Sequence, residues 1–187
     1  MVQVPSSLNF LRTLNVLVGA RAACVGPDVN QATLDLVEEF EGFRAEVYVD
    51  PTGNPTVGYG HLCKQSGCSD VPCPIPLSDA DGEKLLREDI KVAQQCITLD
   101  TTSEVALNEN HYGALVSWSF NVGCNAADGS ILIRRLNNGE DANTVAGEEL
   151  PKWKKGNGKP VAGLAWRRAE VELFKTSTDA GALPVGC

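Results

Sequence analysis

The sequence lacks the long apolar runs and the basic clusters that mark two broad classes of protein. No stretch of about 18 uncharged apolar residues is present, so no segment is expected to span a bilayer and no membrane is expected as a partner. The chain has 24 acidic and 16 basic residues, a net charge of −8, and no cluster of Lys and Arg. Such a surface repels polyanions, which excludes nucleic acid as a partner. Repeats and low-complexity tracts are also missing, so the composition favours one globular domain.

Cysteine, by contrast, is plentiful, with seven residues in a chain of 187. This number is typical of proteins from oxidising compartments, where disulfides persist. A zinc site is the alternative for the closely spaced Cys63, Cys68 and Cys73, but no CxxC pair accompanies them. Disulfides are favoured, with one thiol left over and the pairing open, although a link from Cys24 to Cys187 would join the ends of the domain. The candidates for pairing are Cys24, Cys63, Cys68, Cys96, Cys124 and Cys187.

The first 22 residues differ in composition from the rest of the chain. Residues 8–20 are mostly apolar, no acidic residue precedes residue 23, and Ala20-Arg21-Ala22 has the small-x-small form of a signal-peptidase site. We expect residues 1–22 to be a signal peptide and residues 23–187 to form a single secreted domain. A short amphipathic helix is the alternative, because Arg12 and Asn15 interrupt the apolar stretch.

The segment after the N-terminal region predicts one helix followed by a small hairpin. Asn30 is a suitable N-cap, and Gly42 lies where the amphipathic helix that follows it should end. Residues 46–50 then alternate as a strand, residues 51–54 have the composition of a turn, and residues 55–60 return as a second strand. The pattern predicts a β-hairpin directly after the first helix.

The rest of the chain reads as helices. After a proline-rich loop, Ser78 begins a helix whose buried face is spaced at intervals of four and three residues. Together with the hairpin, these segments predict an α+β fold with a hairpin lobe, a helical lobe and a cleft between them. The predicted buried face consists of Leu86, Ile90, Ala93 and Ile97, and the later helices span residues 108–121, 130–136, 142–150 and 164–174.

Three polar residues lie at turning points of the helix and hairpin. Glu41 is at the C-terminal end of an apolar helix, where unpaired carbonyl groups disfavour a second negative charge and raise its pKa. Asp50 lies at the exposed hairpin turn and should stay ionised, with Thr56 nearby on the returning strand. Two carboxylates with different pKa values are what glycoside hydrolysis requires, although most acidic residues at such positions are only solvated or caps.

The segment FEGFRAEVYVDPTGNPTVGYGH, with its Glu-x8-Asp-x5-Thr spacing, resembles the catalytic segment of phage-type lysozymes, glycoside hydrolase family 24. Residues 107–123 and 163–170 are similar to later motifs of that family, and the resemblance as a whole covers roughly residues 30–174. The resemblance implies a lysozyme-like fold with Glu41 as catalytic acid, Asp50 as the residue that activates water, and Thr56 as its partner. It also implies cleavage of the β-1,4 bond between N-acetylmuramic acid and N-acetylglucosamine in bacterial peptidoglycan. The cysteines, the N-terminus and the acidic charge resemble lysozymes secreted by fungi.

Four further residues receive predicted roles. Asn121 follows a helix and is expected either to hydrogen-bond an N-acetyl group or to cap that helix. Adjacent arginines point to different faces of a helix, so at most one can reach the site, and we assign Arg167 to substrate binding. His61 is expected to be structural and to pair with Asp89 on the long helix.

No cofactor or metal is implied, since His111 has no partner at ligand spacing. A monomer is the default for an enzyme with a cleft. Two alternatives stay open: a lytic transglycosylase, which uses one acid and no activated water, and a peptidoglycan-binding protein without turnover.

Overall fold

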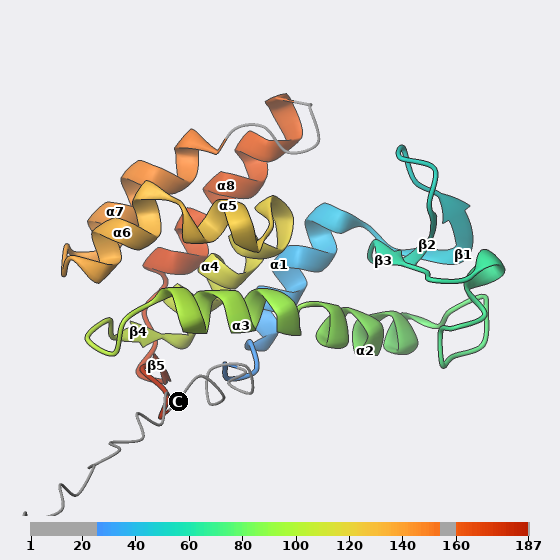
Figure 1. The fold of residues 1–187 in the computed structure, drawn as a ribbon, viewed down its shortest axis with the longest axis horizontal. Coiled ribbons are helices and arrows are strands. Elements are labelled where there is room, and N and C mark those ends of the chain that lie inside the picture. Colours follow the sequence, from blue (N-terminus) through green and yellow to red (C-terminus); the bar gives the residue numbers. More distant parts are fainter. Residues whose placement is uncertain (1–25, 154–159, 187) are drawn as a thin grey trace, which may run out of the picture.

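The computed structural model describes residues 26–153 and 160–186. This part of the chain is mainly helical and carries two small sheets, which confirms the predicted α+β class (Figure 1). The expected signal peptide, residues 1–22, and the suggested link between Cys24 and Cys187 lie outside the described residues.

The first helix, α1, spans Gln31–Glu41 and has the predicted caps. The side chain of Asn30 accepts a hydrogen bond from the backbone N–H of Thr33 at its start. At its end Gly42 adopts φ 74°, a left-handed conformation that glycine tolerates, and donates its N–H to Glu38 O. Glu41 is therefore the last helical residue, next to the chain reversal.

The hairpin follows directly and gains a third strand that the sequence did not predict. Strands β1 (Arg44–Val49), β2 (Pro55–Gly58) and β3 (His61–Leu62) form an antiparallel sheet in that order. The sheet packs on a small core of its own, separate from the main one, that includes Val57 and Leu77. This core makes the hairpin lobe a distinct packing unit.

The long helix predicted from Ser78 is in fact two helices. Ser78 caps α2, which spans Asp79–Asp89, and α3 spans Lys91–Asp100, with Ile90 between them. Leu86 and Ile90 are almost fully buried, so the predicted apolar face continues across the interruption. Hydrophobic periodicity could not locate the break, because the apolar side chains on both sides of Ile90 keep the same spacing and face the same core.

The helical lobe is built around α4, which spans Glu109–Val122 and is buried along most of its length. The prediction that this part of the chain contains only helices is wrong, because a short ladder of β4 (Leu107–Asn108) with β5 (Gly181–Leu183) ties segments far apart in sequence. The remaining helices are α5 (Cys124–Asp128), which was not predicted, α6 (Ile131–Asn137), α7 (Ala142–Glu149) and α8 (Pro160–Lys175), with 3-10 turns at Ser66–Cys68 and Leu150–Lys152.

Two disulfides are present among the described residues. One joins Cys63 to Cys68 under the hairpin sheet, and the other joins Cys96 on α3 to Cys124 on α5. Cys73 is a free thiol. These bonds confirm four of the six disulfide candidates.

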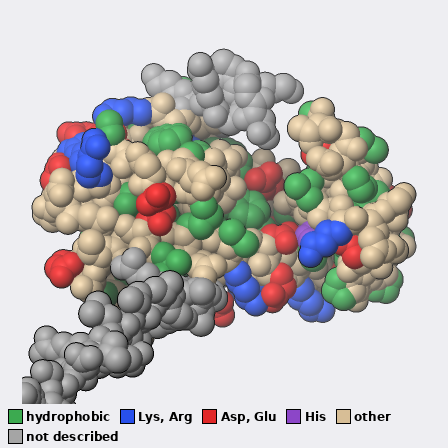
Figure 2. All heavy atoms as spheres, in the orientation of Figure 1, with side chains coloured by type: hydrophobic (Ala, Val, Ile, Leu, Met, Phe, Trp, Pro, Cys, Tyr) green, Lys and Arg blue, Asp and Glu red, His purple; other side chains and the backbone are tan. Residues whose placement is uncertain are grey.

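The two lobes flank a hollow. In Figure 1 the three-stranded sheet stands apart from the helical body, and α1 and α2 connect the two parts. Figure 2 shows the hollow between them, with acidic side chains on its walls. In residues 26–153 and 160–186 no helix is both long and apolar enough to span a bilayer.

The close packing of α1 on α4 depends on Gly113. A Cβ atom at this position would collide with the side chain of Thr33. That side chain is fully buried, and its hydroxyl donates a hydrogen bond to Asn30 Oδ1. We expect Gly113→Ala to reduce the free energy of unfolding by about 1–3 kcal/mol and to lower the Tm accordingly. Gly147→Ala is the control, since a Cβ there meets nothing within 4 Å and helical alanine should leave stability equal or higher. Equal Tm values for the two variants would contradict this packing.

Candidate functional site

Glu41 lies where the end of α1 meets the hairpin lobe. Its neighbour Phe40 stacks on Trp166 of α8, with ring centroids 5.3 Å apart and an interplanar angle of 8°. On the hairpin side, a Cβ atom built on Gly60 would lie 3.7 Å from Glu41 Oε2. The carboxyl group is therefore placed between the helical body and the turn that joins β2 to β3.

The surroundings of Glu41 favour its protonated form. Solvent reaches the side chain, but nearby protein atoms limit hydration of the carboxylate and raise its pKa to about 7. Among the described residues no cation forms an ion pair with Glu41 that would offset this cost. The group can thus hold a proton in mildly acidic solution and give it away, as a general acid must.

Asp50 has the opposite tendency. Its carboxylate accepts hydrogen bonds from the backbone N–H of Asn54 at 2.7 Å, from the Thr52 hydroxyl at 2.7 Å and from the Thr52 N–H at 2.9 Å. The hydrogen bond from Asn54 and then those from Thr52 lower the pKa of Asp50, because they stabilise the charged form. Asp50 therefore remains ionised while Glu41 is protonated.

Thr56 lies on the strand that returns from the Asp50 turn, and in the described residues no direct hydrogen bond joins their side chains. Thr56 pairs with Tyr48 across the sheet, is 2% exposed, and donates its hydroxyl to Asn54 O at 3.1 Å. Asn54 in turn donates its N–H to Asp50. Thr56 and Asp50 are thus connected through Asn54, and their expected cooperation on one water molecule stays a prediction.

Tyr48 is a residue that the sequence reasoning missed. Burial raises its pKa, and the carboxylates of Glu41 and Asp50 both raise it further, so the phenol lies within electrostatic reach of both acids. The guanidinium of Arg44 lies 5.9 Å from the centre of its ring. The sequence signal that could have indicated Tyr48 is its position near the end of the predicted strand, two residues before Asp50.

Arg167 has a different role from the one predicted. Its side chain is 0% exposed, and its Nη2 atom lies 3.1 Å from Glu170 Oε1 and 3.2 Å from Asn121 Oδ1. This burial contradicts the prediction that Arg167 contacts substrate. Asn121 is half-buried, and Gly123 rather than Asn121 caps the end of α4, so only its predicted role in binding substrate stays open.

His61 and Asp89 form the predicted pair. His61 Nδ1 lies 2.9 Å from Asp89 Oδ2, which connects β3 to the last residue of α2. Burial raises the pKa of Asp89, while the contact with His61 lowers it. The pair therefore ties the hairpin sheet to the helix beneath it.

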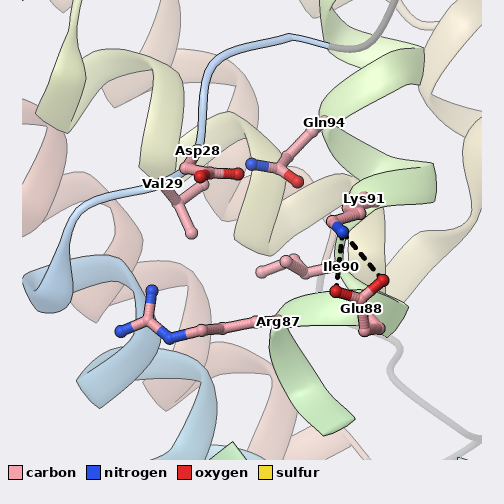
Figure 3. Close-up of a pocket in the computed structure, with 7 residues that line it drawn as sticks. All are labelled: Asp28, Val29, Arg87, Glu88, Ile90, Lys91 and Gln94. Carbon is pink, nitrogen blue, oxygen red and sulfur yellow. Dashed lines mark hydrogen bonds and ion pairs between the residues drawn. The ribbon is translucent and has the colours of Figure 1, made fainter. Parts of the chain in front are cut away.

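The described ranges contain no group of three or more His, Cys, Asp or Glu side chains that could together hold a metal ion. A cavity of about 160 Å³ lies beside the start of α1 and the α2–α3 break, away from Glu41 (Figure 3). The two cations that line it, Arg87 and Lys91, are paired with Glu83 and Glu88. The cavity is therefore not part of the candidate site.

The raised pKa of Glu41 predicts a pH-dependent stability. Because the folded-state pKa of about 7 exceeds the ordinary 4.5, ionisation of Glu41 costs folding free energy as the pH rises from 4.5 through 7. We expect Glu41→Gln to melt at a higher temperature than the wild type above pH 7, with the difference shrinking towards pH 4. Glu39→Gln, an exposed residue of the same helix, is the control and should show no such trend. A difference independent of pH would contradict the assignment.

The contact between His61 and Asp89 predicts a measurable contribution to stability. We expect His61→Asn to lower the free energy of unfolding by about 1–2 kcal/mol, as measured by denaturant titration. Asp89→Asn should cost a similar amount, and the double variant should be no worse than either single variant. Additive losses would mean that the two side chains act independently.

Comparison with known proteins places this arrangement in a family. The model of the family "Phage lysozyme" matches residues 38–171. The endolysin of Acyrthosiphon pisum secondary endosymbiont phage 1 is 36% identical over 154 residues, covering 80% of this chain and 99% of the relative. The endolysin of Bacillus phage PZA is 33% identical over 153 residues, covering 80% of this chain. The chain spans only 56% of that longer relative.

A solved structure supports the same assignment. The crystal structure of a mutant of P22 lysozyme superposes with a TM-score of 0.69 and 31% sequence identity, covering 80% of this chain and 99% of that one. The predicted lysozyme-like fold is therefore confirmed. On the family match and the identities of its relatives, this chain belongs to the phage lysozyme family.

Proposed function

We propose that the protein is a muramidase, a glycoside hydrolase that cleaves bacterial peptidoglycan. The observation that carries the proposal is the pair of carboxylates at the end of α1 and in the turn of the hairpin, one with a pKa raised to about 7 and the other with a lowered pKa. Opposite shifts on two acids divide the roles of proton donor and proton acceptor between them. Membership of the phage lysozyme family supports the choice of substrate.

In the proposed reaction Glu41 gives its proton to the oxygen of the β-1,4 bond that links N-acetylmuramic acid to N-acetylglucosamine. The leaving sugar departs with that proton, and water attacks the anomeric carbon. Asp50, held ionised by Thr52 and Asn54, takes a proton from this water. Thr56 helps to place the water through its position on β2, and Asn121 binds the substrate. Neither cofactor nor metal is needed for these steps.

We further propose that the protein acts as a monomer outside the cell, with residues 1–22 removed as a signal peptide and residues 23–187 forming the catalytic domain. The disulfides Cys63–Cys68 and Cys96–Cys124 support an oxidising environment. The relatives reported above are phage proteins, so the resemblance to lysozymes secreted by fungi rests only on the cysteines, the N-terminal sequence and the acidic charge.

Two other functions are weaker candidates. A lytic transglycosylase makes anhydro sugar ends and has no use for an ionised Asp50 held by three hydrogen bonds. A binding protein without turnover has no use for a carboxyl group with a pKa near neutrality. No feature of the site described above favours either the transglycosylase or the binding protein.

The reaction is tested with purified protein and peptidoglycan at about pH 5, below the pKa of Glu41. We expect new reducing ends on muramic acid and, for Glu41→Gln, a loss of kcat of roughly 100-fold or more, because a general acid contributes at least that much. Glu39→Gln is the matched control and should retain full activity.

Mass spectrometry of the new chain ends separates the alternatives. Anhydro ends would identify a transglycosylase. Sedimentation with peptidoglycan without any release would identify a binding protein, and a Glu41→Gln variant as active as the wild type would remove Glu41 as the acid.

A further inference from the structure

A buried polar layer lies between α4 and α8. Arg167 and Glu170 are both 0% exposed, and Arg167 Nη2 lies 3.1 Å from Glu170 Oε1. Glu170 Oε1 also accepts a hydrogen bond of 2.9 Å from the hydroxyl of Ser117. The same Nη2 atom of Arg167 donates to Asn121 Oδ1 at 3.2 Å. Glu170 thus fixes the guanidinium, and the guanidinium fixes the amide of Asn121.

A series of contacts connects this layer to the end of α1. The guanidinium of Arg167 lies 5.4 Å from the centre of the Trp166 ring. Trp166 stacks on Phe40, which directly precedes Glu41 in the sequence. The layer therefore supports both the helix end that carries Glu41 and the half-buried Asn121.

The contact with Arg167 decides which way the Asn121 amide points. An asparagine side chain has a carbonyl oxygen that accepts and an NH₂ group that donates, whereas a guanidinium only donates. A flipped amide would place two donors against each other, so Oδ1 must face Arg167. The hydrogen bond from Arg167 is the one that the Asn121 side chain makes to the described residues, and it uses Oδ1 rather than Nδ2. Within residues 26–153 and 160–186, the amide orientation of Asn121 is therefore fixed and its Nδ2 group is unpaired.

We propose that Arg167 is a positioning residue that holds Asn121 with its Nδ2 group directed to an acetamido carbonyl oxygen of the glycan. This inference rests on the proposed muramidase function. An N-acetylated sugar offers the acceptor that Nδ2 requires. A de-N-acetylated sugar carries an ammonium group instead, which is a second donor and cannot pair with Nδ2. The arrangement therefore selects acetylated glycan over the deacetylated form.

The test compares two substrates, N-acetylated peptidoglycan chains and the same chains after de-N-acetylation, by the release of reducing ends at about pH 5. The main variant is Arg167→Met, which keeps the length of the side chain but not the donors. Burial raises the pKa of Glu170 and the contact with Arg167 lowers it, so without the guanidinium the acid can take up a proton at this pH and need not remain as an unpaired buried charge.

We expect Arg167→Met to raise KM for acetylated chains about 2- to 10-fold, the value of one hydrogen bond. The value of kcat should be nearly unchanged, because the stacking of Phe40 on Trp166 that holds the end of α1 does not include Arg167. The preference for acetylated over deacetylated chains should fall by the same factor. In an Asn121→Ala background the substitution should have no further effect on KM, because the residue through which it acts is gone. Arg168→Met, the exposed neighbour on the same helix, should change neither parameter.

A purely structural role predicts a different result. Arg167→Met would then lower the Tm and the active fraction equally in both backgrounds and leave the substrate preference intact, which would overturn the inference. Should this variant not melt cooperatively, Asn121→Ala by itself keeps the inference testable, since it removes Nδ2 and should lower the same preference for acetylated chains. If the wild type releases no reducing ends, the proposed function itself fails; if it does and Arg167→Met retains the preference, only the present inference fails.

Discussion

The end of α1 is the constraint on which the site depends. Gly42 stops the helix with a positive φ and turns the chain into β1, so Glu41 is held at a boundary between two packing units. The stacking of Phe40 on Trp166 fixes this helix end from the side of the helical body. Gly60 approaches the carboxyl group from the hairpin. A carboxyl enclosed from two sides but still reached by solvent has the environment that raises its pKa while leaving it accessible to substrate.

Different surroundings give two acids of the same short segment opposite properties. Glu41 loses hydration without gaining a hydrogen bond that compensates among the described residues, and its pKa rises. Asp50, nine residues later in the sequence, accepts hydrogen bonds from backbone and hydroxyl donors of its own turn, and these bonds lower its pKa. Neither shift requires a nearby cation. The division of roles between the acids follows from solvation at one site and local hydrogen bonding at the other.

The layer of Arg167 and Glu170 is an unusual feature of the packing between α4 and α8. Several of its polar atoms, including Arg167 Nε, Arg167 Nη1 and Glu170 Oε2, are buried without a hydrogen-bond partner in the described part of the chain. Burying such groups costs free energy, so the layer is weak evidence for stability. The layer is better explained by the orientation that it imposes on Asn121. Glu170 holds the guanidinium of Arg167, and the guanidinium orients the Asn121 amide.

Local chemistry explains what could be predicted in advance. The caps at Asn30 and Gly42, the hairpin turn and the Glu41, Asp50 and Thr56 spacing depend on neighbours a few residues away, so the sequence was enough to find them. The break at Ile90, the β4–β5 ladder and the burial of Arg167 could not be found in this way. The ladder and the burial of Arg167 depend on contacts between segments far apart in the chain, and the break at Ile90 leaves the hydrophobic periodicity unchanged. Residue identity therefore placed the two acids in the chain and gave Asp50 the local donors that keep it ionised, whereas tertiary packing, by limiting hydration, set the rise in the pKa of Glu41 and decided that Arg167 stays out of the solvent.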